Sequence, residues 1–397
     1  MAKKRIKSKK ANLQNKQAPK PLKEGEVKKN IKDRKPLKKA QGDLELTLNI
    51  AETKSLKVNA KRQTKNRKSA INRTLAKGEK LGKSVGLKIK LANVQLGTRA
   101  FAPNINGKLV ASPKDSKKRI AQAKLGLPNL KGFLPDHLGL KAIPPKLSRK
   151  FAKNHSYGRT KLRRKDDHEA TTIFSPDDRY TFNDTAYPWS TIGRVDVAGG
   201  YASGVMVGPR HLLTVSHVMN WGSGNTAGWV RFRPSYFDGN APFGDAYATR
   251  WYAHKKVTGP TINRSEGRQD YVVLVLNRRI GNTTGWMGAR TYSDSWDNEN
   301  YWRHIGYPGD MASGQRPSYE RDIALDGSFW DAQSHQRIWH RGDVWPGQSG
   351  GPFFAWWSGE SYPSVVAVQS GQNPSENSAS GGSRMVDLII RARNENP

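Results

Sequence analysis

The chain reads Gly347-Gln348-Ser349-Gly350-Gly351-Pro352 near the end of its 397 residues, so that one serine stands among three glycines. A serine hydroxyl is a weak nucleophile at its ordinary pKa. It needs a neighbouring base, and the oxyanion that its attack creates needs hydrogen-bond donors. Glycine suits such a loop because it adopts positive φ without a side-chain penalty. Ser-Gly-Gly is also common in ordinary turns between strands, so the partners of Ser349 decide between the two interpretations.

A histidine and an aspartate supply candidate partners. The segment 203–218 is an apolar, strand-like run that breaks at a Gly-Pro turn and resumes before His217. Asp270 directly precedes the apolar run 271–276, which predicts a buried strand. An aspartate beside a histidine holds the imidazole in one tautomer and stabilises its cation. The chain order is His217, Asp270, Ser349, with gaps of 53 and 79 residues.

These three motifs, in this order, resemble those of the chymotrypsin-like serine proteases. The resemblance covers about residues 174–396, and the segments 175–179, 187–195 and 345–349 resemble the glutamyl-endopeptidase-like branch. It implies an all-β fold of two six-stranded Greek-key barrels followed by a C-terminal helix, with His217 and Asp270 in the first barrel. Short runs rich in Val, Ile, Tyr, Phe and Trp, separated by Gly, Asn, Ser and Pro, also predict a sandwich or barrel.

The resemblance also implies a reaction. A serine endopeptidase of this kind hydrolyses peptide bonds through an acyl-enzyme, with Ser349 as nucleophile, His217 as general base and Asp270 orienting the imidazole. The backbone N–H groups of Gly347 and Ser349 would form the oxyanion hole. Protein or peptide substrates and a monomeric catalytic domain are expected. The sequence has no His or carboxylate cluster with metal-ligand spacing and no phosphate-binding glycine loop, so we expect neither metal nor cofactor.

Five positions are expected to contact the substrate: Asp343, Val344, Gln369, Ser370 and Gly371. Asp343 lies six residues before the candidate nucleophile, where trypsins keep the acid that binds Arg or Lys, although a buried structural hydrogen bond is an equal alternative. Glutamate-selective relatives carry His at the position of Gln369 and Thr or Ser at that of Val344, so the residues here do not favour glutamate specificity. Ser370 and Gly371 are expected to form the strand edge that pairs with substrate backbone.

The first 165 residues differ from the rest. They hold 47 Lys and Arg against 9 Asp and Glu, a net charge of +38, whereas residues 166–397 hold 21 against 24. All twelve Trp lie after residue 165. We therefore expect two parts, a basic and mostly disordered segment 1–165 and a protease domain 166–397, with transient structure near 44–50 and 83–94.

Three roles are open for the basic segment. One is a propeptide of a zymogen, cleaved within the basic run 159–165. The second is an arm that binds nucleic acid electrostatically, and the third is a segment joined to the protease by a gene-model fusion. The activating ion pair of animal zymogens is not expected, because Gln348 stands where those enzymes carry Asp. The alternative function is a basic nuclear or nucleolar protein whose protease-like domain only binds peptides.

The compartment also has two interpretations. The resemblance implies secretion, yet no apolar signal segment follows Met1-Ala2-Lys3-Lys4-Arg5, and the basic clusters resemble nuclear or nucleolar localisation signals. No apolar stretch reaches the length of a membrane span, so no membrane partner is expected. The chain has no cysteine, which excludes disulfides and thiolate metal sites.

Overall fold

The structure is a computed structural model, and it describes residues 18–37, 43–47, 86–90, 110–111, 129–147, 173–174, 176–259, 261–327, 334–372 and 375–397. The chain divides into two units, one of residues 38–97 and one of residues 1–37 and 98–397. In the smaller unit, β1 (Asp43–Thr47) pairs antiparallel with β2 (Gly86–Lys90). These two strands overlap the segments near 44–50 and 83–94 for which the sequence predicts transient structure.

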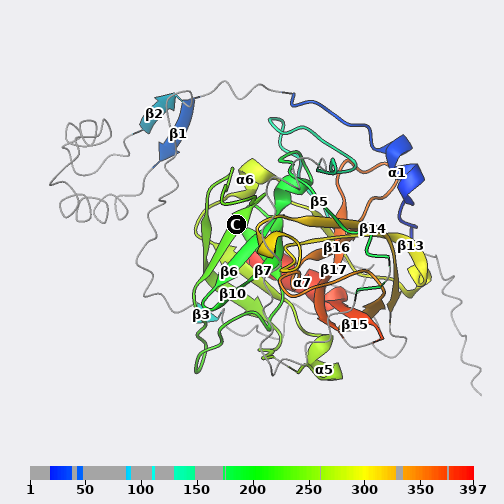
Figure 1. The fold of residues 1–397 in the computed structure, drawn as a ribbon. Helices are drawn as coiled ribbons and strands as arrows, with labels where there is room; N and C mark the ends of the chain where they lie inside the picture. Colours follow the sequence, from blue (N-terminus) through cyan, green and yellow to red (C-terminus); the bar gives the residue numbers. More distant parts are fainter. Residues whose placement is uncertain are drawn as a thin grey trace, which may run out of the picture. The chain divides into compact units, whose positions relative to one another are not determined.

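Six antiparallel strands of the larger unit form a first closed barrel (Figure 1). Their order is β11-β8-β7-β6-β9-β10, and a pairing between β10 and β11 closes it. Closure leaves no free edge in the ring. The strands are β6 (Ile192–Val197), β7 (Gly200–Gly208), β8 (His211–Thr214), β9 (Val230–Pro234), β10 (Ala246–Ala253) and β11 (Val272–Leu276).

A second closed barrel follows the same plan. Its order is β16-β13-β14-β15-β18-β17, and β16 pairs with β17 to close it. Its strands are β13 (Glu299–Gly306), β14 (Ser318–Gly327), β15 (Gln336–His340), β16 (Pro352–Ala355), β17 (Ser364–Gln372) and β18 (Asn377–Gly381). The predicted fold of two six-stranded antiparallel barrels is confirmed.

Short elements extend and connect the barrels. Four short strands add to them: β3 (Val110–Ala111) on β10, β4 (Asn129–Leu130) on β12, β5 (Tyr180–Thr181) on β14 and β12 (Gly288–Arg290) on β17. The short helical turns are η3 (Trp189–Thr191), α5 (Arg264–Gly267), α6 (Gly281–Thr284), η4 (Asp294–Trp296) and η5 (Ala312–Gly314).

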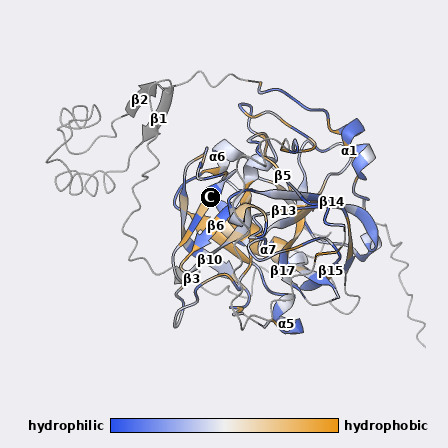
Figure 2. Cartoon of the chain, viewed as in Figure 1, coloured by the Kyte–Doolittle hydropathy of each residue, from blue (hydrophilic) through white to orange (hydrophobic). Residues whose placement is uncertain are grey.

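A C-terminal helix packs on the barrels, as predicted. Helix α7 (Ser383–Glu395) buries Met385, Val386, Leu388, Ile389 and Ala392, which recur at the three- and four-residue spacing of one helical face. Figure 2 shows hydrophobic residues concentrated in the strands at the centre and hydrophilic residues on the outer helices α1 and α5. In the described part of the chain, no helix has the length and hydropathy that crossing a membrane requires.

Besides the short strand β3, two longer segments of the predicted basic arm are folded against the barrels. Residues 18–37 contain helix α1 (Glu24–Asn30), and residues 129–147 lie beside them. Their apolar side chains, too few for a core of their own, are buried with two aromatic rings of the larger fold. This cluster contains Leu22, Val27, Ile31, Leu138, Leu140, Ala142, Tyr187 and Trp356. The boundary predicted at residue 165 therefore does not separate these segments from the barrels; most of the remaining arm lies outside the described residues.

Candidate active site

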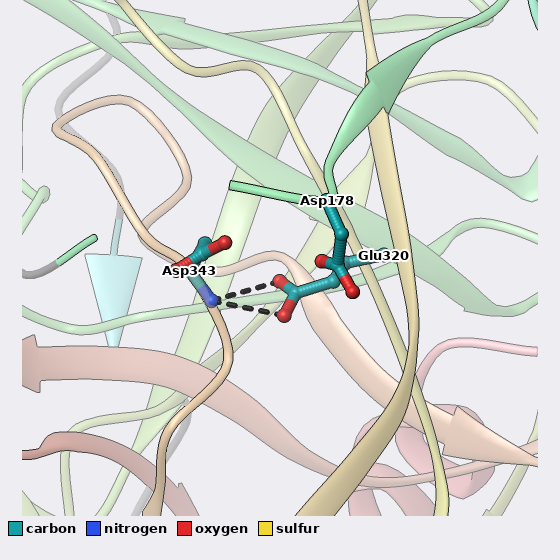
Figure 3. Close-up of side chains that lie close together, drawn as sticks. All are labelled: Asp178, Glu320 and Asp343. Atoms are coloured by element: carbon teal, nitrogen blue, oxygen red, sulfur yellow. Dashed lines mark hydrogen bonds between the residues drawn. The ribbon is translucent and has the colours of Figure 1, made fainter. Parts of the chain in front are cut away.

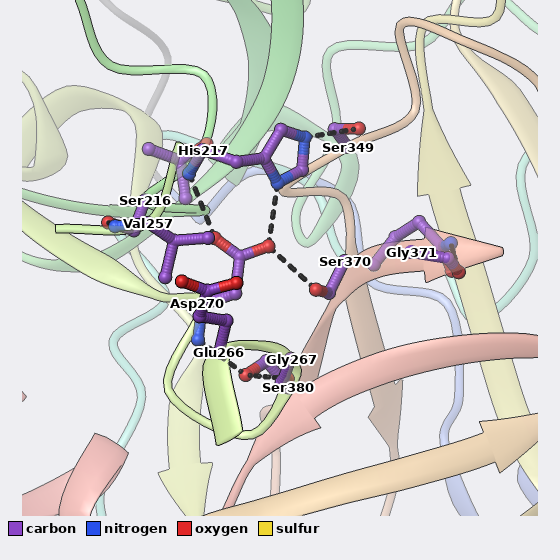
Figure 4. Close-up of polar contacts among 12 residues, drawn as sticks. Ser216, His217, Val257, Glu266, Gly267, Asp270, Ser349, Ser370, Gly371 and Ser380 are labelled. Atoms are coloured by element: carbon purple, nitrogen blue, oxygen red, sulfur yellow. Dashed lines mark hydrogen bonds and ion pairs between the residues drawn. The ribbon is translucent and has the colours of Figure 1, made fainter. Parts of the chain in front are cut away.

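The three candidate catalytic residues form one chain of hydrogen bonds (Figure 4). His217 follows the end of β8 and Asp270 precedes the start of β11, and these strands pair antiparallel with Thr214 opposite Val272. Antiparallel pairing places the end of one strand beside the start of the other, which brings together residues 53 apart. The Nδ1 atom of His217 lies 2.6 Å from Oδ2 of Asp270, and its Nε2 atom lies 3.1 Å from Oγ of Ser349.

Ser349 lies on the loop between β15 and β16 of the second barrel, and Ser203 of β7 connects that loop to the first barrel. The backbone N–H of Ser203 donates to the carbonyl of Ser349 at 2.8 Å, and its hydroxyl donates to the carbonyl of Gly347 at 2.8 Å. The hydroxyl also accepts from the N–H of Tyr307 at 2.9 Å. Ser203 was expected only as part of a strand, and no local sequence signal indicates this second role.

The N–H groups of Gly347 and Ser349 have no acceptor among the described residues. In each case the carbonyl of the same peptide is occupied: Pro346 accepts from Gly309 at 2.8 Å and Gln348 accepts from Gly351 at 2.9 Å. Because N–H and C=O point in opposite directions in a trans peptide, these bonds fix where the two N–H groups point. Both groups therefore remain available to a ligand.

Glycine is required by the conformation of this loop. Gly347 has a φ of 102° and Gly350 a φ of 83°, in the region that other residues rarely adopt. A side chain on Gly350 would also collide with Thr214 and with the carbonyl of Ser203. The glycines predicted to allow close approach are thus needed where the two barrels meet.

Asp270 is fully buried, and its backbone and side chain are held by hydrogen bonds to His217, Ser370 and Ser380. Its carboxylate accepts from the backbone N–H of His217 at 2.8 Å and from the hydroxyl of Ser370 at 2.6 Å, in addition to the imidazole. Its own N–H donates at 3.0 Å to Ser380, whose hydroxyl donates to Gly267 at 2.8 Å. Ser370 was expected to offer its backbone to substrate, and the bond from its hydroxyl to Asp270 was not predicted.

The surroundings of His217 stabilise its protonated form more than water stabilises a free imidazolium. Burial lowers the pKa of His217, but the charge of Asp270 and the hydrogen bond to it outweigh burial and leave the pKa above its ordinary value. The imidazole can thus accept a proton at Nε2 while Asp270 compensates the resulting charge.

Asp343, a candidate for binding basic side chains, is engaged inside the protein. Its side chain accepts from the N–H of Phe174 at 2.6 Å, and the residue is 2% exposed. Its own N–H donates to both carboxylate oxygens of Glu320 (Figure 3). These contacts favour the structural alternative for Asp343.

Asp343, Glu320 and Asp178 form an acidic cluster that the sequence did not reveal, because its members are far apart in the chain. One carboxylate oxygen of each lies within 4.8 Å of the others. Burial raises the pKa of all three carboxyl groups, to about 6 for Asp343 and well above its usual range for Glu320. The cluster therefore holds protons more readily than free carboxylates do.

The other expected substrate contacts carry no positive charge. Val344 is 2% exposed, and the amide of Gln369 accepts from His340 at 2.9 Å and donates to the carbonyl of Gly371 at 3.0 Å. Burial lowers the pKa of His340 to about 3, so this imidazole is neutral. Neither Gln369 nor the histidine behind it offers a cation to a substrate carboxylate.

Comparison with known proteins gives a partial sequence match and fold-level matches. No family model matches the chain. Glutamyl endopeptidase of Bacillus licheniformis is 28% identical over 185 residues, which are 46% of this chain and 54% of that protein. The chain thus spans about half the length of this relative.

Solved structures of similar proteins are more distant in sequence. A Glu endopeptidase in complex with MPD is 19% identical with a TM-score of 0.46, and the match covers 56% of this chain and 100% of that one. Protease Anisep from Arthrobacter nicotinovorans is 21% identical with a TM-score of 0.41, covering 54% and 98%. With its two closed barrels and the chain order His217, Asp270, Ser349, the chain has the chymotrypsin-like fold and is similar in sequence to the glutamyl-endopeptidase branch of that family.

Proposed function

We propose that the chain is a serine endopeptidase that hydrolyses peptide bonds through an acyl-enzyme. The observation that carries the proposal is the continuous hydrogen-bonded chain from Asp270 through His217 to Ser349, beside two N–H groups with no acceptor among the described residues. A nucleophile, a base and its orienting acid within hydrogen-bond reach are what acyl transfer needs. The order of the hydrogen bonds assigns the roles: Ser349 is the nucleophile, His217 the base and Asp270 the orienting acid.

In the first half of the reaction, the Oγ atom of Ser349 attacks the peptide carbonyl as Nε2 of His217 takes its proton. The N–H groups of Gly347 and Ser349 donate to the oxyanion, and Asp270 stabilises the imidazolium. The imidazolium then gives its proton to the leaving amine as the C–N bond breaks. Water, deprotonated by the same imidazole, attacks the ester and releases the acid and Ser349.

Covalent labelling tests this proposal directly. A fluorophosphonate is expected to modify Ser349 and no other serine, because within the described part of the chain only this hydroxyl has a base and an oxyanion site beside it. Peptide mapping by mass spectrometry identifies the modified residue. The alternative function rests on the net charge of +38 in residues 1–165. Salt-dependent retention of the full chain on RNA, with Ser349 unlabelled, would support that alternative and contradict the proposal.

The pH dependence of the reaction should follow His217. Only its neutral form can accept the proton of Ser349, so kcat/KM is expected to fall as the pH drops through the pKa of His217. Because Asp270 raises that pKa, the midpoint should lie above the ordinary value of about 6.5. The measurement is kcat/KM for a peptide whose own charge does not change between about pH 5 and pH 9. An acid limb with a midpoint below the ordinary histidine value would contradict the assignment.

Asp343 is expected to weaken the fold at neutral pH. Its folded pKa of about 6 lies above the ordinary 3.8, so its favourable contribution is present at low pH and is lost as the pH rises through 6. Asp343→Asn keeps an oxygen for the N–H of Phe174 and cannot ionise. The variant should melt at a higher temperature than the parent at about pH 8, with the difference shrinking below about pH 4.

The same variant separates the two interpretations of Asp343. If the carboxylate is structural, Asp343→Asn leaves the peptide-cleavage profile unchanged. A parent enzyme that prefers Arg or Lys and a variant that loses this preference would show instead that Asp343 binds substrate.

A further inference from the structure

Arg179 brings a buried cation to the residue that precedes the candidate nucleophile. Its side chain is 0% exposed, and its Nη1 atom donates to Oε1 of Gln348 at 2.9 Å. The same oxygen accepts from the backbone N–H of Trp345 at 2.8 Å. The Gln348 side chain is thus held between Arg179 and the start of its own loop.

Two aspartates compensate the charge of Arg179. Asp177 accepts from Nε at 3.0 Å and from Nη2 at 2.9 Å, a two-pronged contact that fixes the plane of the guanidinium. Asp310 accepts from Nη2 at 2.6 Å. Burial alone lowers the pKa of Arg179, but these two carboxylates outweigh it and raise the pKa. Arg179 therefore remains a cation, and its contacts with Asp177 and Asp310 hold its position independently of Gln348.

The contacts of Arg179 bear on the peptide that carries the N–H of Ser349. The carbonyl of Gln348 is held by Gly351 and its N–H donates to Trp345 at 3.1 Å, while Arg179 holds its side chain. With all three groups of Gln348 fixed, the orientation of the Ser349 N–H is fixed as well. A second contact joins the segment before β5 to the residues that precede this loop, because the backbone N–H of Phe174 donates to the side chain of Asp343.

We propose that Arg179 is a positioning residue that keeps the loop 345–349 in its catalytic conformation from within the folded chain. In animal zymogens, a new N-terminal ammonium pairs with an Asp at the position of Gln348; here an internal guanidinium binds the amide at that position. Arg179 lies beyond the basic run 159–165, so cleavage there neither supplies nor removes this contact. The catalytic loop forms without proteolytic release of a new N-terminus. This inference rests on the proposed function.

Intact protein tests the independence from cleavage. Full-length chain, verified by mass, is expected to react with a fluorophosphonate at Ser349 at the same rate as chain cleaved within 159–165. Cleaved chain that reacts when intact chain does not would overturn the inference while supporting the proposed function. Failure of both forms to react would instead contradict the proposed function itself, so the two failures are distinguishable.

Variants test the positioning role. Arg179→Met is expected to lower kcat about 100-fold with little change in KM, as a misplaced catalytic group does. Gln348→Met removes the contact with Arg179 and also the bond from Trp345, so it should lower kcat at least as much. The double variant should be no less active than Gln348→Met alone, because the contact between the two residues is already lost. Effects on kcat that multiply in the double variant would contradict action through Gln348.

A matched control reports the cost of breaking a buried Arg–Asp pair. Arg316 is 3% exposed and donates to Asp238 at 2.8 Å and 2.9 Å. Arg316→Met should lower the melting temperature and leave kcat near that of the parent. If Arg179→Met does not fold, Arg179→Lys keeps the charge but not the planar fork, and is expected to fold with a lowered kcat. Unchanged kcat in a folded Arg179→Lys chain would overturn the positioning role.

Discussion

Replacing Ser349 with alanine is expected to lower kcat for peptide hydrolysis by about 10⁴-fold to 10⁶-fold, the largest loss of activity for any single substitution in this chain. The Oγ atom is the only atom that can form the ester bond, and water cannot replace it at the same position with the same base. The residual rate would come from the N–H groups of Gly347 and Ser349. Initial rates of cleavage of a fluorogenic peptide measure the loss, with the variant at a concentration high enough for its slow turnover to be detected.

The fold of the variant should be unchanged, because the Ser349 hydroxyl contributes one hydrogen bond, to His217. Its melting temperature is therefore expected within about 4 °C of the parent, since a net hydrogen bond contributes about 1 kcal/mol or less. Ser358→Ala, on an exposed turn, is the matched control and should keep full activity. Cleavage by Ser349→Ala at the parental rate would exclude Ser349 as the nucleophile.

The fold and the three candidate catalytic residues were predictable because their signals are local. His217 ends an apolar strand-like run, Asp270 begins another, and Ser349 lies in a glycine loop. Each signal describes a few neighbouring residues, and the chain order combines them. The antiparallel pairing of β8 with β11 then brings the first two together without further information.

The contacts that fix the site were not predictable in this way. Ser203 joins the two barrels at Gly347, and Arg179 reaches Gln348 across 169 residues of sequence. A serine in a strand or an arginine after two aspartates has many ordinary uses, and only the tertiary packing selects one. For Asp343 the sequence left two uses open, and burial with a bond from Phe174 favours one of them.

Composition also gave too simple an account of the basic segment. Averaged over 165 residues, charge hides the few apolar side chains, and an isolated segment of that kind has too little to bury. The structure nevertheless buries Leu22, Val27 and Ile31 against the larger fold. Composition alone does not show that such a surface is present. The folded pieces therefore bear on whether the segment can be discarded as a propeptide.

The second large effect is expected when residues 18–37 are removed. Glu24 of α1 accepts from Arg303 at 2.8 Å and from Arg321 at 2.9 Å, and the side chain of Arg303 is only 1% exposed. Losing the Glu24 partner of Arg303 costs up to about 3–5 kcal/mol, the cost that applies when the other charge of a pair stays buried. Losing the burial of three large apolar side chains adds about 5–9 kcal/mol. The sum is comparable to the whole stability of an ordinary domain, about 5–15 kcal/mol.

A chain that begins at residue 38 is therefore expected to be largely unfolded at 25 °C by circular dichroism and to lose activity with its fold. Glu24→Ala, which removes the carboxylate alone, should lower the melting temperature by about 6–20 °C. Glu26→Ala on the same helix is the control, because Glu26 is exposed, and it should cost at most about 1 kcal/mol. If cleavage occurs between 148 and 172, residues 18–37 should stay bound as a second chain, seen by native mass spectrometry and separated under denaturing conditions. A stable, active protein that begins at residue 166 would show that the contacts of Glu24 are dispensable, and the segment could then be discarded as a propeptide.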